Sequence, residues 1–373
     1  MINGGKMKKI KVAMVTNHFG MTGIAAVIMN YCKCLDKNKY KVTIIAGKPF
    51  SEVHLNECKQ NGIEIQELPS RYGDTFGHYF NLWKVLKKGK FDIVHIHGNS
   101  AMMAIELMIA LAAGIHIRIA HCHNSTCINK KAHRMLQPLF NTLYQKGLAC
   151  SDLAGKWAFG ERKYEVLPNA FETKKFAFNT NRREQVRAKY RIENRFVIGH
   201  IGRFNEQKNQ QFLIDILKEV LKTKDNAVLM LVGDGPDFEK ISDYAKSAKL
   251  KNNVLLCGET NDTASLYDAM DVFVFPSKYE GLGIVAVEAQ ISGLPCVISD
   301  KVPQDVVIGP NVSFLPLDYK ISCWVDAISN GQASNRSREV FYDSNKKQIA
   351  KFEIKENATR LDKIYESLLS QKG

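Results

Sequence analysis

Two glutamates and two glycines in the segment Tyr279–Ala289 have types and spacing that suit the binding of a sugar phosphate. An apolar run just before them, at 272–276, predicts a buried strand, and a helix is expected to begin near Ile284. Ligands of open α/β sheets bind where strands end, and glycine lets the backbone approach them closely. The first amides of a helix are donors at a positive dipole end, which favours a phosphate. The residues expected to line this pocket are Glu280, Gly281, Leu282, Gly283, Ile284, Val285 and Glu288.

The two carboxylates of this segment can serve different parts of one ligand. Glu288 lies about one turn into the expected helix, where it would accept hydrogen bonds from a ribose diol. Glu280 precedes the helix and would reach a sugar hydroxyl. The alternative is that one acid caps the helix and the other lies on the surface, because glycine-containing strand–helix turns are common.

Two cations follow the first apolar run of the second half of the chain. Residues 198–209 read Ile-Gly-His-Ile-Gly-Arg-Phe-Asn-Glu-Gln-Lys-Asn, so Arg203 and Lys208 lie five positions apart in a loop where a strand ends. A guanidinium with forked donors and a lysine point charge, opposite a helix N-terminus, would form a clamp for a diphosphate. Either cation alone would suit an exposed loop, whereas the pair in this context favours the clamp.

Short apolar runs alternate with helix-length segments along the chain, which predicts an α/β fold with parallel sheets covered on both faces. The expected strands are 9–16, 40–46, 91–97, 116–121, 196–201, 227–232, 253–257, 271–276 and 295–299. The expected helices include 23–35, 210–223, 237–248, 263–269 and 284–292. A chain of 373 residues is too long for one core, so two domains are expected.

The expected domain boundaries lie where this alternation pauses. A polar stretch rich in lysine, arginine and asparagine predicts an interdomain linker at 171–194, between an N-terminal domain at 7–170 and a C-terminal domain at 195–350. Residues 351–373 carry apolar side chains near helical spacing. They predict a terminal helix that packs back on the N-terminal domain.

Taken in order, these motifs resemble the retaining glycosyltransferases of family 4. The resemblance covers nearly the whole chain and lies in Thr22-Gly23, His121–Asn124, Leu167–Ala170, Gly202-Arg203 with Lys208-Asn209, the turn Leu231–Pro236, and Glu280 with Glu288. It implies the GT-B fold, in which two Rossmann-like domains face each other across a cleft and a terminal helix docks on the body. The segments 79–98 and 288–290 look like the branch that builds capsules, exopolysaccharides and O-antigens.

The resemblance also implies a role for each matching residue of the second half. Arg203 and Lys208 would bind the diphosphate of a nucleotide-sugar donor, and Glu288 would bind its ribose. Glu280 would contact hydroxyls of the donor sugar. The loop that begins at Gly258 would border the nucleobase.

In the first half, the resemblance places His123 near the reacting sugar and Gly23 at the phosphates across the cleft. Thr22 replaces the first glycine of the usual pair, which is a departure from the family's pattern in that loop. Ala170 replaces the usual glycine of a Pro-Asn-Gly turn, a smaller departure. The residues expected to take part in catalysis are His123, Arg203, Lys208 and Glu280.

Four histidines on two neighbouring expected strands raise the question of a metal site: His95, His97, His121 and His123. A His-x-His pattern on a strand places both imidazoles on one face. However, no acidic or cysteine ligand accompanies them at ligand spacing, and the chain has no Asp-x-Asp motif for a diphosphate-bound divalent ion. We therefore expect no metal and no other cofactor, and the nucleotide sugar would be a substrate.

The net charge of +14 is uneven, with 23 Lys+Arg against 11 Asp+Glu in residues 1–170 and 29 against 27 in residues 171–373. A basic N-terminal half favours an anionic partner such as a membrane surface, although a basic surface without a partner is the alternative. No apolar run reaches the roughly 20 residues that span a bilayer. The start of the chain lacks the pattern of a secretory signal, and the nine scattered cysteines favour a reducing compartment. We expect a cytoplasmic protein, peripheral on the inner face of the plasma membrane.

The expected function is transfer of a sugar from a nucleoside-diphosphate donor, UDP-linked, to a hydroxyl of a growing, lipid-linked surface glycan, with retention. The rival is a GT-B-fold sugar-nucleotide epimerase, which would use the same phosphate grip without an acceptor. A hydride-transferring Rossmann enzyme is disfavoured, because residues 17–23 contain no G-x-G-x-x-G. A nucleic-acid-binding protein would explain the basic half but not the acidic and basic residues of the second half, so no nucleic-acid partner is expected.

Overall fold

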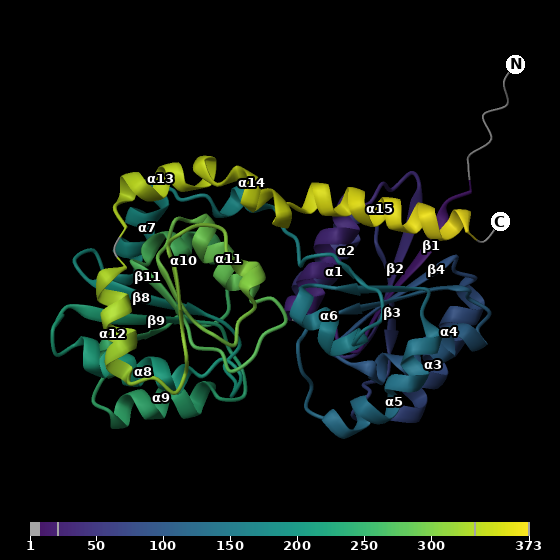
Figure 1. Cartoon of the computed structure of the whole chain (residues 1–373), viewed down its shortest axis with the longest axis horizontal. Coiled ribbons are helices and arrows are strands. Elements are labelled where there is room, and N and C mark those ends of the chain that lie inside the picture. Colours follow the sequence, from purple (N-terminus) through teal and green to yellow (C-terminus); the bar gives the residue numbers. More distant parts are fainter. Residues whose placement is uncertain (1–7, 21, 332, 372–373) are drawn as a thin grey trace, which may run out of the picture. The chain divides into compact units, whose positions relative to one another are not determined.

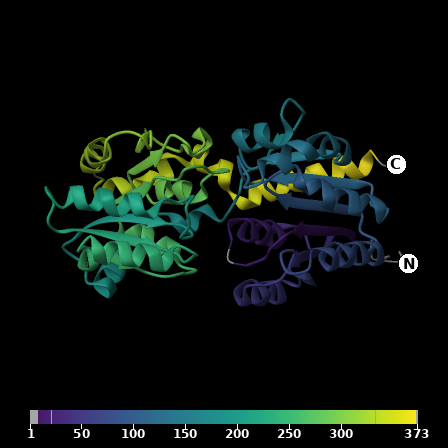
Figure 2. The ribbon, with the colours of Figure 1, turned by 90° about the horizontal axis from the view of Figure 1, so that it is seen from below.

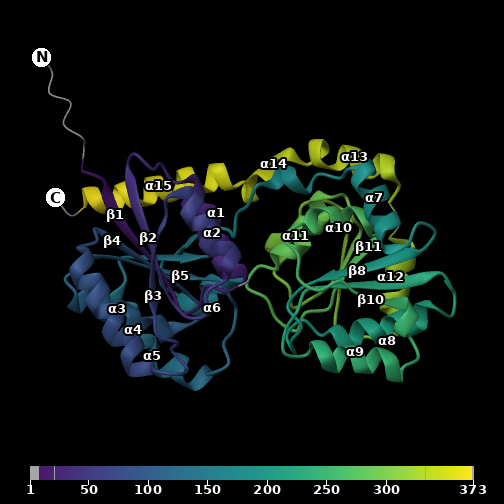
Figure 3. The ribbon, with the colours of Figure 1, turned by 180° about the vertical axis from the view of Figure 1, so that it is seen from behind.

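The computed structural model describes residues 8–20, 22–331 and 333–371. It divides the chain into two compact units: unit 1 is Met1–Phe171 with Lys351–Gly373, and unit 2 is Glu172–Ala350 (Figure 1). The first residue of the expected N-terminal domain, position 7, and the last two of the expected terminal helix lie outside the described residues. Figures 2 and 3 show from two further directions that each unit has a central sheet between helices.

Unit 1 is built on a parallel sheet of seven strands in the order β3-β2-β1-β4-β5-β6-β7. The strands are β1 (Ile10–Thr16), β2 (Tyr40–Gly47), β3 (Glu64–Leu68), β4 (Ile93–Gly98), β5 (Ile117–Cys122), β6 (Lys146–Ala149) and β7 (Glu165–Val166). The four strands expected in this half are present. The other three were missed because β3 is polar and largely exposed, while β6 and β7 are too short to show a hydrophobic pattern.

Helices cover both faces of this sheet. They are α1 (Gly23–Cys34), α2 (Glu52–Asn61), α3 (Thr75–Gly89), α4 (Ala104–Ala112), α5 (Lys130–Leu143), α6 (Asp152–Phe159) and α15 (Ile354–Ser370). Helix α1 packs against α2 and α15, whereas α4 packs between α3 and α5, so the two groups lie on opposite sides of the sheet (Figures 1 and 3). Apolar residues of α15, including Leu361 and Tyr365, are buried in the core of unit 1 together with α1 and β1.

Unit 2 repeats the plan with a parallel sheet of six strands in the order β10-β9-β8-β11-β12-β13. The strands are β8 (Phe196–Ile201), β9 (Ala227–Val232), β10 (Val254–Leu256), β11 (Val272–Phe275), β12 (Cys296–Ser299) and β13 (Val312–Leu315). The helices are α7 (Thr180–Tyr190), α8 (Gln210–Val220), α9 (Phe238–Ser247), α10 (Thr263–Ala269), α11 (Ile284–Ile291), α12 (Ile321–Asn330), α13 (Asn335–Ser344) and α14 (Lys346–Ile349). All five strands expected here are present, and β13, a half-buried edge strand, was missed.

The stretch 171–194, expected to be a linker, is instead a folded part of unit 2 that contains α7. Its arginines are used inside the unit. Arg182 Nε lies 2.6 Å from the fully buried Asp268 carboxylate, and Arg183 Nη2 lies 2.5 Å from Asp271. Arg187 also contacts Asp271 and is buried. A polar composition therefore gave a false linker signal, because the acidic partners of Arg182 and Arg183 lie 86 and 88 residues further along the chain.

Candidate active site

The carboxyl ends of the strands of unit 2 meet at one edge of its parallel sheet, and the loops that follow them are hydrogen-bonded together. The amide of Gly233, after β9, donates to the carbonyl of Gly258, after β10, at 2.8 Å. The amide of Lys278, after β11, donates to the carbonyl of Gln207, after β8, at 2.8 Å. The Gln207 side-chain amide also donates to Tyr279 O at 2.9 Å. The amide of Phe204, after β8, donates to the carbonyl of Asp234, after β9, at 2.9 Å, so these bonds join the loops that hold the predicted site residues into one rim.

Two glycines explain how closely these loops approach one another. A Cβ atom on Gly233, whose φ is +128°, would lie 2.3 Å from the carbonyl oxygen of Gly202. A Cβ atom on Gly235, whose φ is +155°, would lie 2.3 Å from the carbonyl oxygen of Phe204. The turn after β9 therefore supports the backbone of the loop that carries Arg203.

Lys208 and Glu280 are brought into direct contact at this rim. Lys208 Nζ lies 2.6 Å from Glu280 Oε1, and their side chains are only 15% and 8% exposed. The same ammonium lies 4.7 Å from the centre of the Phe275 ring, the last residue of β11. A cation for a phosphate and a carboxylate for a sugar hydroxyl thus occupy one small region, although they are 72 residues apart in sequence.

Arg203 lies in the same loop but is placed differently from Lys208. Its side chain is exposed. Its backbone is held, because the Gln210 side chain at the start of α8 donates to Arg203 O at 3.0 Å. The two predicted cations thus share a loop but not a common ion pair.

Helix α11 begins at this rim as expected. Gly283 is its N-cap residue in the left-handed conformation, with φ +83°, and a Cβ atom there would lie 3.1 Å from Val302 and 3.2 Å from Phe275. Glycine therefore satisfies both the backbone conformation and the limited space. The amides of Ile284 and Val285 belong to the first turn, which carries the positive end of the helix dipole.

Two neighbours of Glu280 in this turn, Gly281 and Leu282, are buried. The Leu282 side chain is only 2% exposed and packs inside unit 2. It can therefore offer a ligand its backbone groups but not its side chain. Gly258, by contrast, is half-buried with φ +69°, and no described atom lies within 4 Å of a Cβ atom placed on it, so its loop has room for a ligand.

Glu288 is held by a partner that the sequence did not indicate. The hydroxyl of Tyr267, on α10, lies 2.9 Å from Glu288 Oε2 and 3.1 Å from Val285 O. Burial raises the pKa of Glu288 to about 7, although the hydrogen bond with Tyr267 acts in the opposite direction. Tyr267 leaves the second carboxylate oxygen available to a hydroxyl donor. Tyr267 reads in the sequence as an ordinary apolar position of a short helix, and no motif marks it.

In unit 1, His123 follows β5 and is 7% exposed. Its Nε2 lies 2.9 Å from His97 Nδ1, and its Nδ1 lies 2.9 Å from Asn169 Oδ1. Burial lowers the pKa of His123 to about 4, against a smaller opposing effect of the Asn169 hydrogen bond. His123 is therefore neutral at physiological pH with both ring nitrogens hydrogen-bonded, which suits a positioning group better than a general base.

Gly23 is the first residue of α1 and is exposed. No described atom lies within 4 Å of a Cβ atom placed on it, so packing within the described part of unit 1 does not require glycine there. Thr22 replaces the usual glycine because it is the N-cap: its hydroxyl accepts from the amide of Ala25 at 3.3 Å. This substitution stabilises the start of α1.

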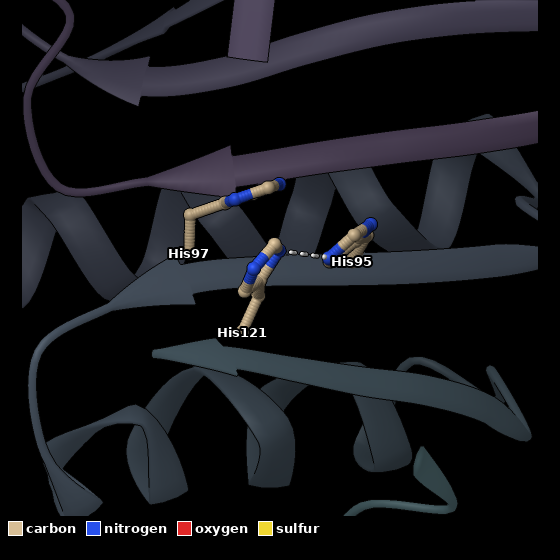
Figure 4. A group of neighbouring side chains, drawn as sticks. All are labelled: His95, His97 and His121. Atoms are coloured by element: carbon tan, nitrogen blue, oxygen red, sulfur yellow. Dashed lines mark hydrogen bonds between the residues drawn. The ribbon is translucent and has the colours of Figure 1, made fainter. Parts of the chain in front are cut away.

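The histidines of β4 and β5 form a buried cluster (Figure 4). The strand register pairs His97 with His121, and ring nitrogens of His95, His97 and His121 lie within 4.8 Å of one another. Burial and the neighbouring imidazoles hold the pKa of each of these three histidines well below its usual value. Three neutral imidazoles are a ligand set that zinc accepts, so the remaining question is whether their nitrogens are available.

Hydrogen bonds already use the nitrogens of two of them. His121 Nε2 lies 3.3 Å from the carbonyl of Leu167, which can only accept, so this nitrogen carries the proton. His121 Nδ1 then accepts from His95 Nε2 at 3.2 Å, the bond drawn in Figure 4, and His95 Nδ1 accepts from the Tyr365 hydroxyl at 2.8 Å. A metal ion would have to replace these bonds, so the cluster is better explained as a polar network inside the core.

This network also fixes the segment that leaves unit 1. Besides His121 on Leu167 O, the hydroxyl of Tyr31 donates to Pro168 O at 2.7 Å, and the amide of Asn30 donates to Ala170 O at 3.0 Å. Residues from α1, β5 and, through His95, the terminal helix therefore hold the connection between the units from one side.

Comparison with known proteins finds glycosyltransferase families in both units. A family model described as Glycosyltransferase Family 4 matches residues 21–154, and one described as Glycosyl transferases group 1 matches residues 182–348. The chain is 30% identical over 370 residues to EpsF of Bacillus subtilis (strain 168), whose name assigns it to the glycosyltransferases; the match covers 95% of this chain and 96% of EpsF.

Two further relatives have more specific names. The UDP-Gal:alpha-D-GlcNAc-diphosphoundecaprenol alpha-1,3-galactosyltransferase of Escherichia coli is 28% identical, with 78% of this chain and 80% of the relative covered. The capsular polysaccharide biosynthesis glycosyltransferase CapH of Staphylococcus aureus is 26% identical, with 96% and 99% covered.

Among solved structures, Anabaena HepE in complex with UDP and glucose shares the fold, with a TM-score of 0.81 at 18% identity over 96% of this chain and 100% of that chain. The two parallel sheets, the two family models matched in order and the relative at 30% identity lead to one assignment. The chain belongs to glycosyltransferase family 4 and has the GT-B fold of that family.

Proposed function

We propose that this glycosyltransferase moves a sugar from a UDP-linked donor to a hydroxyl of a growing surface polysaccharide that is carried on a membrane lipid, with retention at the anomeric carbon. The polysaccharide is supported by the capsular name of the Staphylococcus aureus relative. The lipid carrier is supported by the diphosphoundecaprenol in the name of the Escherichia coli relative. The nucleotide is supported by that same name and by the UDP bound to the HepE structure.

The observation that carries the proposal is the contact of Lys208 with Glu280 beside the start of α11. Breaking the bond between sugar and diphosphate leaves negative charge on the phosphate. Lys208, Arg203 and the first amides of α11 can stabilise that charge, and groups that are already in place contribute most of such an effect. Glu280 would accept a hydrogen bond from a hydroxyl of the transferred sugar, next to the cation that holds the leaving diphosphate.

A front-face attack with retention agrees with the groups available in unit 1. His123 has a lowered pKa and both of its ring nitrogens are hydrogen-bonded to protein groups, so it would line the space beside the acceptor hydroxyl rather than remove its proton. The leaving phosphate oxygen would then take the proton of the acceptor hydroxyl. The residues present need no metal for this step, and we propose that none is required.

The sugar-nucleotide epimerase considered as an alternative is not favoured, because three relatives that match 78–96% of this chain are named as glycosyltransferases. An epimerase and a transferase differ in whether they need an acceptor. An epimerase would convert the nucleotide sugar without an acceptor, whereas a transferase releases UDP in step with the consumption of acceptor.

The decisive experiment is a transfer assay with UDP-sugars and a polyprenyl-diphosphate-linked sugar. We expect UDP release that depends on the acceptor, and a product whose anomeric configuration, read by NMR, matches that of the donor. Arg203→Ala should reduce turnover while the protein stays folded, and the exposed Lys278→Ala is the matched control. Release of UDP without acceptor consumption, an inverted product, or full activity in Arg203→Ala would contradict the proposal.

A further inference from the structure

Helix α3 carries large apolar side chains on both of its faces. Its inner face places Leu82 and Leu86 in the core of unit 1, each at most 1% exposed. Its outer face carries Phe76, Phe80 and Trp83, which are 81%, 43% and 37% exposed. The outer face of a surface helix normally carries polar residues, so these three aromatic side chains need an explanation.

The three aromatic side chains form one continuous strip. The rings of Phe76 and Phe80 are stacked with centroids 5.9 Å apart, and those of Phe80 and Trp83 are stacked with centroids 6.2 Å apart. Lys84 continues the strip, because its Nζ lies 4.3 Å from the centre of the Phe80 ring. Exposed aromatic side chains beside lysines are typical of a helix that lies in a membrane interface.

Further exposed apolar side chains lie near the starts of α3 and α5. They are Tyr72 at 99%, Ile128 at 102% and Met135 at 76% exposure. Helices α3, α4 and α5 cover the same face of the sheet (Figures 1 and 3). Because α3 and α5 follow parallel strands, their first turns lie at the carboxyl edge of the sheet, the edge at which Gly23 and His123 also lie.

The same face is cationic. Residues 71–143, which include the loop before α3, contain nine Lys+Arg and three Asp+Glu, a net charge of +6. The exposed cations of α3, α5 and the residue after α3 are Lys84, Lys87, Lys88, Lys90, Lys130, Lys131 and Arg134. Of the three acids, Glu106 is buried, Asp92 is half-buried, and Asp74 is the exposed N-cap of α3, so the seven exposed cations outnumber the acids at this surface.

The loop that leads into α3 is held in place by contacts of Arg71 with Glu106 and Tyr79. Arg71 Nη1 lies 3.8 Å from Glu106 Oε1, and the Arg71 guanidinium lies 5.4 Å from the centre of the Tyr79 ring. Arg71 therefore links the loop to α4 and to the inner side of α3. This arrangement presents Tyr72 and Phe76 to solvent on a supported backbone.

We propose that the outer faces of α3 and α5, with the loops before them, dock on an anionic phospholipid surface. The aromatic side chains enter the interfacial layer, where Trp, Tyr and Phe are favoured, and the lysines contact the headgroups. A second copy of the chain is a poorer occupant, because two faces of the same positive charge would repel each other. The inference rests on the lipid-linked acceptor proposed above, since it would hold the acceptor edge of unit 1 against the membrane.

The first test is flotation of the full-length protein with vesicles of 30 mol% phosphatidylglycerol in phosphatidylcholine. Three Lys→Gln changes, Lys84, Lys87 and Lys130, should weaken partitioning about a hundredfold, at about fivefold for each lysine near an anionic surface. Changing Phe76 and Met135 to Ser should weaken it at least tenfold. The matched controls are Lys218→Gln, Lys240→Gln and Lys347→Gln together, and Tyr319→Ser with Val340→Ser, all exposed in unit 2, which should change nothing.

The second test reads the depth of Trp83. The chain has three tryptophans; Trp324 is fully buried and Trp157 is stacked on His133 with ring centroids 4.0 Å apart. A Trp157→Phe background therefore leaves Trp83 as the reporter. Its emission should shift to the blue with anionic vesicles, be quenched by brominated lipids, and stay partly shifted in 0.5 M NaCl, because insertion is not screened.

Three results would overturn the inference. They are partitioning unaffected by the Phe76 and lysine variants, complete release by salt with no Trp83 quenching, and a concentration-dependent dimer that Phe76→Ser abolishes. Failure of the docking surface is distinguishable from failure of the proposed function. If only the docking surface is wrong, all variants keep wild-type UDP affinity and turnover on a detergent-solubilised acceptor, and the wild-type enzyme has equal turnover on vesicles with and without anionic lipid.

Discussion

The ion pair between Lys208 and Glu280 makes a prediction that separates catalysis from stability. Lys208→Ala removes the cation from a carboxylate that is 8% exposed. Glu280 keeps its other contacts, so we expect a loss of about 2 kcal/mol from the free energy of unfolding. In a unit of 179 residues, from Glu172 to Ala350, that corresponds to a decrease in Tm of about 4–8 °C.

The same substitution should reduce turnover about 100- to 1000-fold, because it removes a donor from the leaving diphosphate. The double variant Lys208→Ala/Glu280→Gln should recover most of the Tm, since no buried carboxylate then lacks its cation. It should not recover turnover.

Differential scanning fluorimetry and the transfer assay, run on the same preparations, measure both effects. Lys278→Ala is the matched control, because Lys278 and Glu206 connect the same two loops at 3.0 Å but are 42% and 87% exposed. We expect neither Tm nor turnover to change there. The reasoning is refuted if Lys208→Ala keeps wild-type turnover, or if the double variant is no more stable than the single one.

Three further predictions follow from the other groups of the site. Because burial raises the pKa of Glu288 from 4.5 to about 7, the contribution of Glu288 to stability is present below pH 4.5 and is lost as pH rises through about 7. The affinity for UDP-glucose, measured by calorimetry, should increase as pH rises through about 7, because the carboxylate forms there. Glu288→Gln should weaken binding and remove the pH dependence of both stability and affinity. Tyr365→Phe removes the donor to His95 inside the core, so it should lower the free energy of unfolding by about 1–3 kcal/mol in denaturant titrations while UDP affinity stays unchanged. An unchanged free energy of unfolding would contradict the hydrogen-bond network. Turnover should survive EDTA, and loss of activity that Mn²⁺ restores would show that a metal is required.

Local sequence signals were enough to determine the fold and the position of the candidate site along the chain. Short continuous apolar runs such as 227–232 are typical of strands buried on both faces, and parallel strands collect the residues at their carboxyl ends at one edge. The loops of Arg203 and Glu280 were therefore predicted to meet, whereas the loop of Gly258 was placed beside them by the family resemblance. Backbone hydrogen bonds join the three loops into one rim. Weak strands such as β3 and β13 escaped because edge strands are partly exposed and lack this pattern.

What each side chain does at that edge was decided only by the tertiary structure, because it depends on partners far away in sequence. Lys208 reads as a loop cation until Glu280 lies beside it, and Arg182 reads as part of a linker until Asp268 is buried against it. The aromatic strip of α3 has the same origin: a helix with large apolar side chains on both faces does not reveal from its sequence which face the core takes. The core covers Leu82 and leaves Phe76 at the surface, since the strands beneath α3 set the rotation of the helix, and only folding brings those strands together.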